Sequence, residues 1–343
     1  MDNHFRKDHT ISTELEGGHF RLSETDRTLD LHWKSGSLKY SDFKLMTEGG
    51  TAKLYTCFDE NLRRKVVYKT LHDHLKESKI ETHRFLREAR VTANIAHPGT
   101  IPVYELGRDR GGSLFFTMKH VNGRDLRSVI LALNGGDEQT AEIFPLPVLI
   151  DILIQVCQTV AHAHQRGVIH RDLKPANILT GEFGETYVID WGLAKVWGEP
   201  ELSTSPTLDH QGNHSLTPVG RRYGTTLYTA PELMRGDNFV DGRVDVFCLG
   251  NVLFEILTHQ QLLQGETVSQ IRESLLNHPL PTPSQVASER DIPIQLEDIC
   301  IRALKKEPVN RFDSVQSFLK LSLIHISAPT RPRLISYAVF CLK

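Results

Sequence analysis

Cysteine is scarce in this chain, and the few cysteines form no recognisable pattern. Among the 343 residues there are five: Cys57, Cys157, Cys248, Cys300 and Cys341. No two of them stand in a Cys-x-x-Cys pair or suggest a disulfide framework, so we expect a reducing, cytoplasmic compartment. The 17 histidines include no His-Glu-x-x-His motif, which argues against a zinc site.

The chain also lacks an excess of charge and a long apolar run. Its 40 basic and 42 acidic residues give a net charge of −2, so we expect no attraction to nucleic acid or to an anionic membrane. No apolar run approaches the ~20 residues that cross a bilayer, and no membrane segment is expected in the chain as given. With 39% hydrophobic and 24% charged residues, the composition is globular, at a length for about two domain-sized units.

The pattern of residue types changes along the chain. Residues 1–41 mix charges, serine and glycine without periodicity, which predicts a mobile extension or, alternatively, a docking segment. Residues 42–121 carry runs of β-branched and aromatic residues and one helical pattern near 79–94, whereas residues 122–321 are mostly helical, most clearly at 148–166. We therefore predict an α+β fold with a small β-rich lobe, a larger helical lobe and a ligand cleft between them.

The most informative stretch is His-Arg-Asp-Leu-Lys-Pro-Ala-Asn at residues 170–177, followed by Asp-Trp-Gly at 190–192. Phosphoryl transfer needs a carboxylate beside the attacking hydroxyl, a cation on the moving phosphate, and oxygen ligands for a metal ion. Asp172, Lys174, Asn177 and Asp190 supply these groups in that order. The order and spacing resemble the catalytic loop and metal-binding motif of protein kinases, with Trp191 where phenylalanine is usual.

This resemblance implies a role for each residue of the stretch. Asp172 would orient the substrate hydroxyl and accept its proton, and Lys174 would neutralise charge on the γ-phosphate of ATP. Asn177 and Asp190 would hold Mg²⁺, with Mn²⁺ as a possible substitute.

The nucleotide side of the cleft shows both agreement with the family and departure from it. Residues 66–69, Val-Val-Tyr-Lys, resemble the kinase strand whose lysine contacts the phosphates, so Lys69 is expected to pair with Glu88 on the following helix. The alternative is that Glu88 belongs to a solvated charged face. Residues 47–54 stand where the family has a glycine-rich loop. Only the middle family glycine, Gly49, remains, with Gly50 beside it, while Thr47 and Ala52 replace the other two. This predicts reduced nucleotide affinity, or a simple hairpin turn.

The resemblance also assigns an adenine pocket and a ribose contact. The pocket positions, which include the gatekeeper and the hinge, are Leu54, Val67, Met118, Val121 and Leu179. Asp125 matches the ribose-contact position. An aspartate near a helix start can instead be a helix cap.

The second half of the chain resembles the peptide side of a protein kinase. Residues 224–232 resemble the segment ending in Ala-Pro-Glu that forms the floor for a substrate peptide. Lys174 and Thr225 favour serine and threonine hydroxyls as acceptors. Asp245 matches the helix that anchors the catalytic loop, and Arg311 is expected to pair with Glu232, although each alone could be an ordinary surface charge.

The segment between Gly192 and Ala230 is long and rich in hydroxyl side chains. We expect autophosphorylation within residues 204–217, in which a homodimer would allow one copy to modify another, and the alternative is a plain linker. Arg171 and Lys195 match the basic pocket that captures a phosphorylated loop. The candidate phosphorylation sites are Thr204, Ser205, Thr207, Ser215 and Thr217.

The C-terminal sequence does not continue the helical pattern of the preceding residues. Residues 322–341 resemble translated sequencing-adapter text, so we predict that 322–343 are unstructured, with a short docking tail as the alternative. If they are an artefact, the native protein would continue and could be tethered to a membrane. Our interpretation is a Ser/Thr protein kinase catalytic domain of the bacterial branch. The rival interpretations are a pseudokinase that serves as a nucleotide-binding or scaffold module, and a small-molecule kinase.

Overall fold

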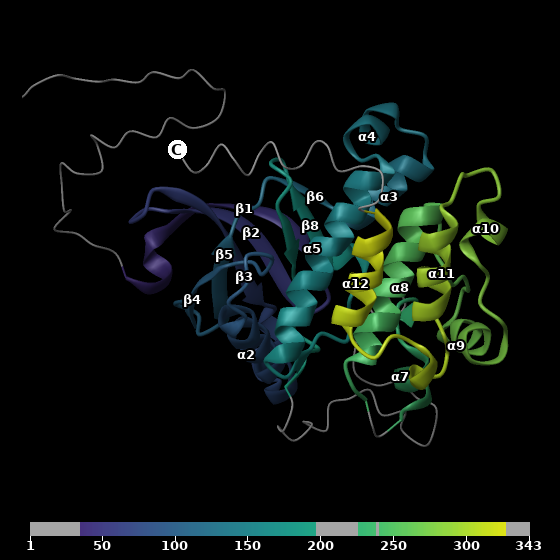
Figure 1. Ribbon diagram of the computed structural model, residues 1–343. Coiled ribbons are helices and arrows are strands. Elements are labelled where there is room, and N and C mark those ends of the chain that lie inside the picture. The colour runs from purple at the N-terminus through teal and green to yellow at the C-terminus, as the bar shows by residue number, and fades with distance from the viewer. Residues whose placement is uncertain (1–34, 197–225, 238–239, 327–343) are drawn as a thin grey trace, which may run out of the picture.

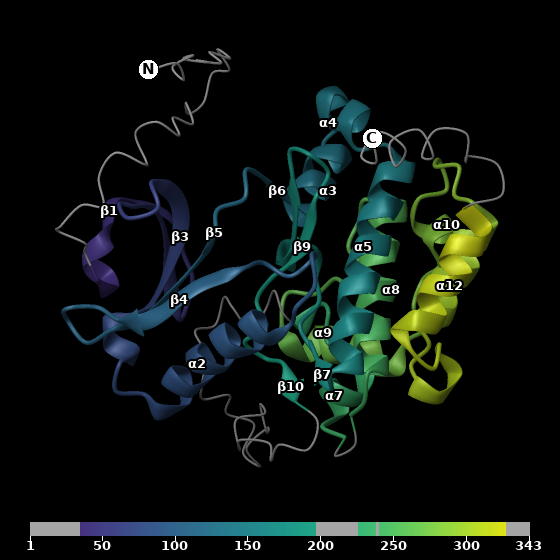
Figure 2. The ribbon, with the colours of Figure 1, turned by 60° about the vertical axis from the view of Figure 1, so that its left-hand side comes forward.

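The computed structural model describes residues 35–196, 226–237 and 240–326. An antiparallel sheet with one helix forms one part, and a cluster of helices forms the other (Figures 1 and 2). This arrangement confirms the predicted α+β, two-lobed architecture. The sheet order is β1-β2-β3-β5-β4, and its strands are β1 (Tyr40–Glu48), β2 (Ala52–Asp59), β3 (Arg64–Leu71), β4 (Val103–Arg108) and β5 (Leu114–Lys119).

The small lobe starts earlier than residue 42, where the sequence placed its boundary. A 3₁₀ helix, η1 (Gly36–Lys39), leads into β1. Tyr40 is buried, and its hydroxyl donates to Glu105 on β4 over 2.6 Å. Residues 36–41 are therefore part of the lobe, because a buried aromatic ring with a satisfied hydroxyl fastens this segment to the sheet.

Helix α2 (Lys79–Asn94) covers one face of the sheet, and its bounds match the predicted helix. Its N-cap residue is Ser78, whose side chain accepts a hydrogen bond from the backbone N–H of Glu81. Phe85 packs against Phe116 of β5. Side chains alternate between the faces of a strand, so β3 directs Lys69 and Tyr68 to opposite sides of the sheet.

The helical lobe is built around one buried helix. Every residue of α8 (Arg243–Thr258) from Val244 onward is buried, and α8 contacts α5, α10, α11 and α12. The remaining helices are α3 (Leu126–Asn134), α4 (Glu138–Ile143), α5 (Leu146–Gln165), α7 (Pro231–Arg235), α9 (Val268–Asn277), α10 (Pro283–Val286), α11 (Ile294–Ala303) and α12 (Val315–Ile326).

Helix α5 matches the predicted helix at 148–166 to within two residues at each end. A proline in its first turn suits its start, and Gly167, with φ of +74°, follows its end. Among the described residues it is the one helix whose length and mean hydropathy of 1.5 would suit a membrane span. Its apolar residues, however, face α8 and α12 within the lobe's core.

Five very short strands between the helices hold the candidate site. Strand β7 (Val168–Ile169) pairs with β10 (Lys195–Val196), while β8 (Ile178–Gly181) pairs with β6 (Gly123–Asp125) and β9 (Thr186–Val188). Short 3₁₀ turns complete the fold: η2 (Asp73–Leu75), η3 (Pro175–Asn177) and η4 (Pro308–Asn310). The sequence analysis did not predict these strands, because two to four residues carry no periodicity.

The last helix extends into the segment that was predicted to be unstructured. Helix α12 runs from Val315 to Ile326, five residues past the expected boundary at 321. Between Val315 and Pro329 the sequence contains no proline or glycine, so no helix-breaking residue ends the helix at 321. Residues 327–343 lie outside the described residues.

Candidate active site

The buried carboxylate of Asp245 holds the loop that follows β7. Its oxygens accept hydrogen bonds from the backbone N–H groups of His170 and Arg171, each over 2.9 Å. His164 of α5 adds a contact of 2.7 Å from Nε2 to Oδ2. Arg171 has a φ of +67°, a left-handed conformation that costs energy in a non-glycine residue and persists only where neighbours enforce it. Asp245 therefore anchors the loop by its backbone, as predicted.

The hydrogen bonds at Asp245 also set its charge. Burial alone would raise the pKa of its carboxyl, but the hydrogen bond and charge of His164, with His170, outweigh burial and lower the pKa below its ordinary value. The anchor is thus ionised at neutral pH, where an anionic acceptor binds backbone N–H groups most strongly.

Asp172 lies at the centre of the site with one oxygen bound and one bare. Its Oδ2 accepts from Lys174 Nζ over 2.7 Å and from Asn177 Nδ2 over 3.3 Å. Its Oδ1 is buried and has no hydrogen-bond partner within the described residues. Burial raises the pKa of Asp172, while the charge of Lys174 lowers it and that of Asp190 raises it. A buried carboxylate oxygen without a partner is suited to receive a donor from a ligand.

Asn177 and Asp190 are brought together by the backbone between them. The N–H of Ile189 donates to the carbonyl of Asn177 over 2.9 Å, and Asp190 has a φ of +64°. The amide Nδ2 of Asn177 donates to the backbone carbonyl of Asp172 over 2.8 Å, so its acceptor oxygen is the end that can ligate a cation. An amide and a carboxylate oxygen fit Mg²⁺, which takes its remaining ligands from phosphate and water.

The aromatic residue after Asp190 is part of the core. Trp191 is fully buried, lies 4.5 Å between ring centroids from His170, and donates from Nε1 to the carbonyl of Val188. His170 in turn contacts the Ile189 carbonyl through Nε2 and accepts from the Asp172 N–H at Nδ1. The His170 and Trp191 rings thereby join the two loops that carry Asp172 and Asp190.

Lys69 and Glu88 form the predicted ion pair across the small lobe. The ammonium of Lys69 contacts Oε1 of Glu88, and both side chains are about nine-tenths buried. Glu88 is therefore not part of a solvated face. A β-carbon placed on Gly192 would lie 3.2 Å from Asp190 Oδ1 and 3.6 Å from Glu88 Oε2, so the pair lies directly beside the metal-binding candidate Asp190.

The residues predicted to form the nucleotide pocket lie on neighbouring strands. Val67 of β3 stands opposite Met118 of β5, and Leu179 of β8 stands opposite Asp125 of β6. The other predicted pocket residues are Leu54 on β2, Gly49 and Gly50 in the turn before it, and Val121 after β5.

Asp125 caps helix α3. Its Oδ1 accepts from the backbone N–H of Ser128 over 2.9 Å, and its Oδ2 accepts from the Ser128 hydroxyl over 2.6 Å. This is the cap that the sequence analysis held as the alternative. The ribose contact stays a prediction, since both oxygens already have a partner.

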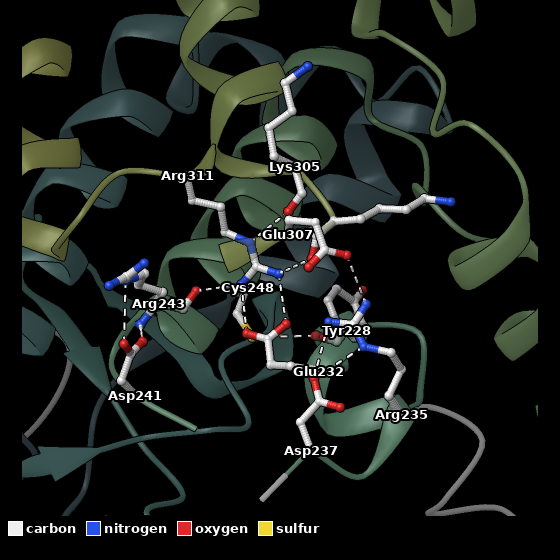
Figure 3. A network of polar contacts seen from close by, with 11 residues as sticks. Tyr228, Glu232, Arg235, Asp237, Asp241, Arg243, Cys248, Lys305, Glu307 and Arg311 are labelled. Carbon is white, nitrogen blue, oxygen red and sulfur yellow. Dashed lines mark hydrogen bonds and ion pairs between the residues drawn. The ribbon is translucent and has the colours of Figure 1, made fainter. Parts of the chain in front are cut away.

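The predicted pair of Glu232 and Arg311 is at the centre of a buried network (Figure 3). Two nitrogens of Arg311 each contact one carboxylate oxygen of Glu232 over 2.7 Å. The guanidinium also donates to the backbone carbonyls of Arg243, Lys305 and Lys306. The network joins α7, α8 and the segment before α12, and so holds the floor segment to the core.

The comparison with known families agrees with this geometry. Residues 40–323 match the family model described as the protein kinase domain. The chain belongs to the protein kinase domain family. The serine/threonine-protein kinase PknD of Chlamydia pneumoniae is 32% identical over 282 residues, which cover 81% of this chain and 30% of the relative. That of Protochlamydia amoebophila is 30% identical over 288 residues, covering 82% and 29%.

These relatives confirm the bacterial branch of the kinase family that the sequence analysis inferred. The kinase domain spans about 30% of the length of each.

The predicted regulatory residues of the kinase domain are only partly within the described residues. Lys195 pairs in β10 with Ile169 of β7, two residues before Arg171, so the two basic residues of the expected phosphate pocket lie on adjoining backbone. The hydroxyl candidates lie outside the described residues: Thr204, Ser205, Thr207, Ser215, Thr217 and Thr225.

Two supporting residues of the kinase domain were not found from the sequence. His164 contacts Asp245 from a helix 81 positions away, and Gly192 separates the carboxylates of Asp190 and Glu88. Gly192 lies inside a motif that was quoted, so its small size was an available signal. His164 offered no signal, because a histidine on an amphipathic helix is not distinguished from its neighbours until the partner is in place.

Proposed function

We propose that this domain transfers the γ-phosphate of ATP to serine and threonine hydroxyls of proteins. The observation that carries the proposal is the half-bound carboxylate of Asp172. Its Oδ2 contacts Lys174, and its buried Oδ1 has no protein partner in the described part of the chain. A substrate hydroxyl would donate to Oδ1, while Lys174, bound to the same carboxylate, would lie beside the phosphate that the hydroxyl attacks.

The other site residues would position the phosphates of ATP and neutralise their charge. Lys69, held by Glu88 in a buried ion pair, would contact the α- and β-phosphates. Asn177 and Asp190 would hold the metal ion, for which Mg²⁺ is the expected species and Mn²⁺ a substitute. That ion would supply positive charge to the phosphates. The hydroxyl proton would pass to Asp172 as the oxygen–phosphorus bond forms, and ADP would leave with the electrons of the broken bond.

Several further properties follow from this function. Because it would depend on ATP, we expect the domain to act in the cytoplasm, and its acceptors would be proteins rather than nucleic acids. Modification of the loop at 204–217 in a transient homodimer would regulate the activity, with Arg171 and Lys195 receiving the phosphate.

The test is transfer of labelled γ-phosphate from ATP and Mg²⁺ by the whole chain, with and without a generic acceptor protein. Asp172→Asn should abolish incorporation while ATP binding persists. Asp298→Asn, which changes an exposed aspartate on α11, should leave incorporation unchanged. Mapping of the labelled residues would then show whether the 204–217 loop is modified. Nucleotide binding without any incorporation by the unaltered chain would instead favour a pseudokinase.

A further inference from the structure

The turn that stands in place of the glycine-rich loop is held from outside by one histidine. His72 directly follows β3, and its backbone N–H donates to the carbonyl of Thr51 over 3.0 Å. Its ring nitrogen Nε2 lies 2.6 Å from the carbonyl oxygen of Gly49. A carbonyl can only accept, so the ring donates from Nε2. One residue therefore binds two carbonyls of the same short turn.

These two hydrogen bonds determine where the turn's N–H groups point. Each peptide unit is planar and trans, so a carbonyl directed to one side sends the following N–H to the other. Binding of the Gly49 carbonyl by His72 thus directs the N–H of Gly50 away from the ring. Within the turn, the N–H of Gly49 donates back to Ala52 over 2.9 Å, which closes the hairpin.

The ring lies on the face of the sheet opposite Lys69. His72 lines a groove of about 580 Å³ together with Tyr68 and Thr70 of β3, and strand alternation puts Lys69 on the other face. The Gly49 carbonyl is drawn toward the groove, so the Gly50 N–H is directed toward the face of Lys69. That is the face on which the proposed function places the phosphates of ATP.

We propose that His72 is a positioning residue for the nucleotide phosphates. The inference rests on the proposed function, because it assumes that ATP is the ligand of this turn. Thr47 and Ala52 stand where the family has glycines, and these residues restrict the backbone. His72 compensates by fixing the turn in one conformation before the nucleotide arrives, which lowers the ordering cost of binding. The other ring nitrogen, Nδ1, lies 3.7 Å from Oε1 of Glu48, which is too far for a hydrogen bond, so the Gly49 carbonyl is the partner that orients the ring.

The experiment compares three variants of the whole chain. His72→Ala removes the ring donor, and His72→Gln keeps an N–H donor at a similar reach. His83→Ala removes an exposed histidine of α2 in the same lobe and serves as the matched control. The affinities for MgATP and for adenosine, and the KM for ATP and kcat of phosphate transfer, are measured for each.

We expect His72→Ala to weaken the binding of MgATP but not that of adenosine. One net hydrogen bond corresponds to a factor of about two to ten in affinity, so His72→Ala should raise the Kd and KM of MgATP about fivefold. Its kcat and adenosine affinity should stay within about twofold, and His72→Gln should recover most of the loss. Equal weakening of adenosine, no effect of His72→Ala, or no recovery by glutamine would overturn the inference. If the unaltered chain itself transfers no phosphate, the proposed function fails, while the MgATP and adenosine affinities still decide the role of His72.

Discussion

At the scale of single residues, the environment of Asp172 predicts how activity depends on pH. Burial raises the pKa of its carboxyl above the ordinary 3.8, and the nearby charge of Lys174 opposes that rise. The carboxylate accepts a proton in catalysis, so activity should fall as the pH drops through this raised pKa. Lys174→Met removes the opposing charge, which should move the acidic limb of the kcat profile to higher pH. A limb that stays in place or moves to lower pH would contradict this account.

The residues around Asp172 also show how far the sequence could predict the site. Asp172, Lys174 and Asn177 lie within one short loop, and their spacing alone was sufficient to bring them together. Asp190 and Glu88 could be assigned only through the family resemblance, because their approach across Gly192 depends on tertiary structure. His72 and His164 could not be assigned, since both act on backbone or side chains distant in sequence.

At the scale of elements, the attachment of α7 to the core predicts a large difference between two arginines. Arg311 is fully buried and binds Glu232 with two hydrogen bonds, whereas Arg235 pairs at the surface with Asp237 and Glu307. Removing one partner of a buried pair costs about 3–5 kcal/mol, and an exposed pair contributes about 0–1 kcal/mol. Urea unfolding should therefore show a loss of that larger size for Arg311→Ala and almost none for Arg235→Ala.

A second variant separates charge from geometry at the same position. Arg311→Lys keeps the positive charge but cannot donate to Glu232 and to three backbone carbonyls at once. It should therefore lose most of the stability that Arg311→Ala loses. Full retention of stability in the lysine variant would show that the charge alone holds α7.

The elements themselves could be predicted where their patterns were long. The 16 residues of α2 and the 20 of α5 carry several turns of periodicity, and both were placed to within two residues. The strands β6 to β10 were missed, because they are set by pairing with distant segments rather than by local pattern. The end of α12 was placed too early, because the change in sequence pattern at residue 322 was taken for the end of the helix.

At the scale of the whole molecule, the proposed ligand would touch both lobes. Lys69 and Glu88 come from the sheet lobe, and Asp172 and Asp190 come from the helical lobe. Gly192 lies between the carboxylates of Glu88 and Asp190. Lys119, at the end of β5, adds a direct link by donating to the Tyr187 hydroxyl of β9 over 2.5 Å. A nucleotide bound by these residues should therefore stabilise the lobes together rather than one of them.

That coupling predicts a thermal shift that depends on residues of both lobes. At about 100 times its Kd, a ligand stabilises the folded state by about 2.7 kcal/mol, which corresponds to a rise in Tm of roughly 4 °C for a chain of this size. MgATP should produce this rise in the unaltered chain. Lys69→Met should largely remove it, whereas Lys65→Met, on the same strand but exposed, should retain it. Asp190→Asn should remove only the part that requires Mg²⁺, because its carboxylate acts through the metal. A shift that survives both Lys69→Met and Asp190→Asn would place the nucleotide elsewhere on the molecule.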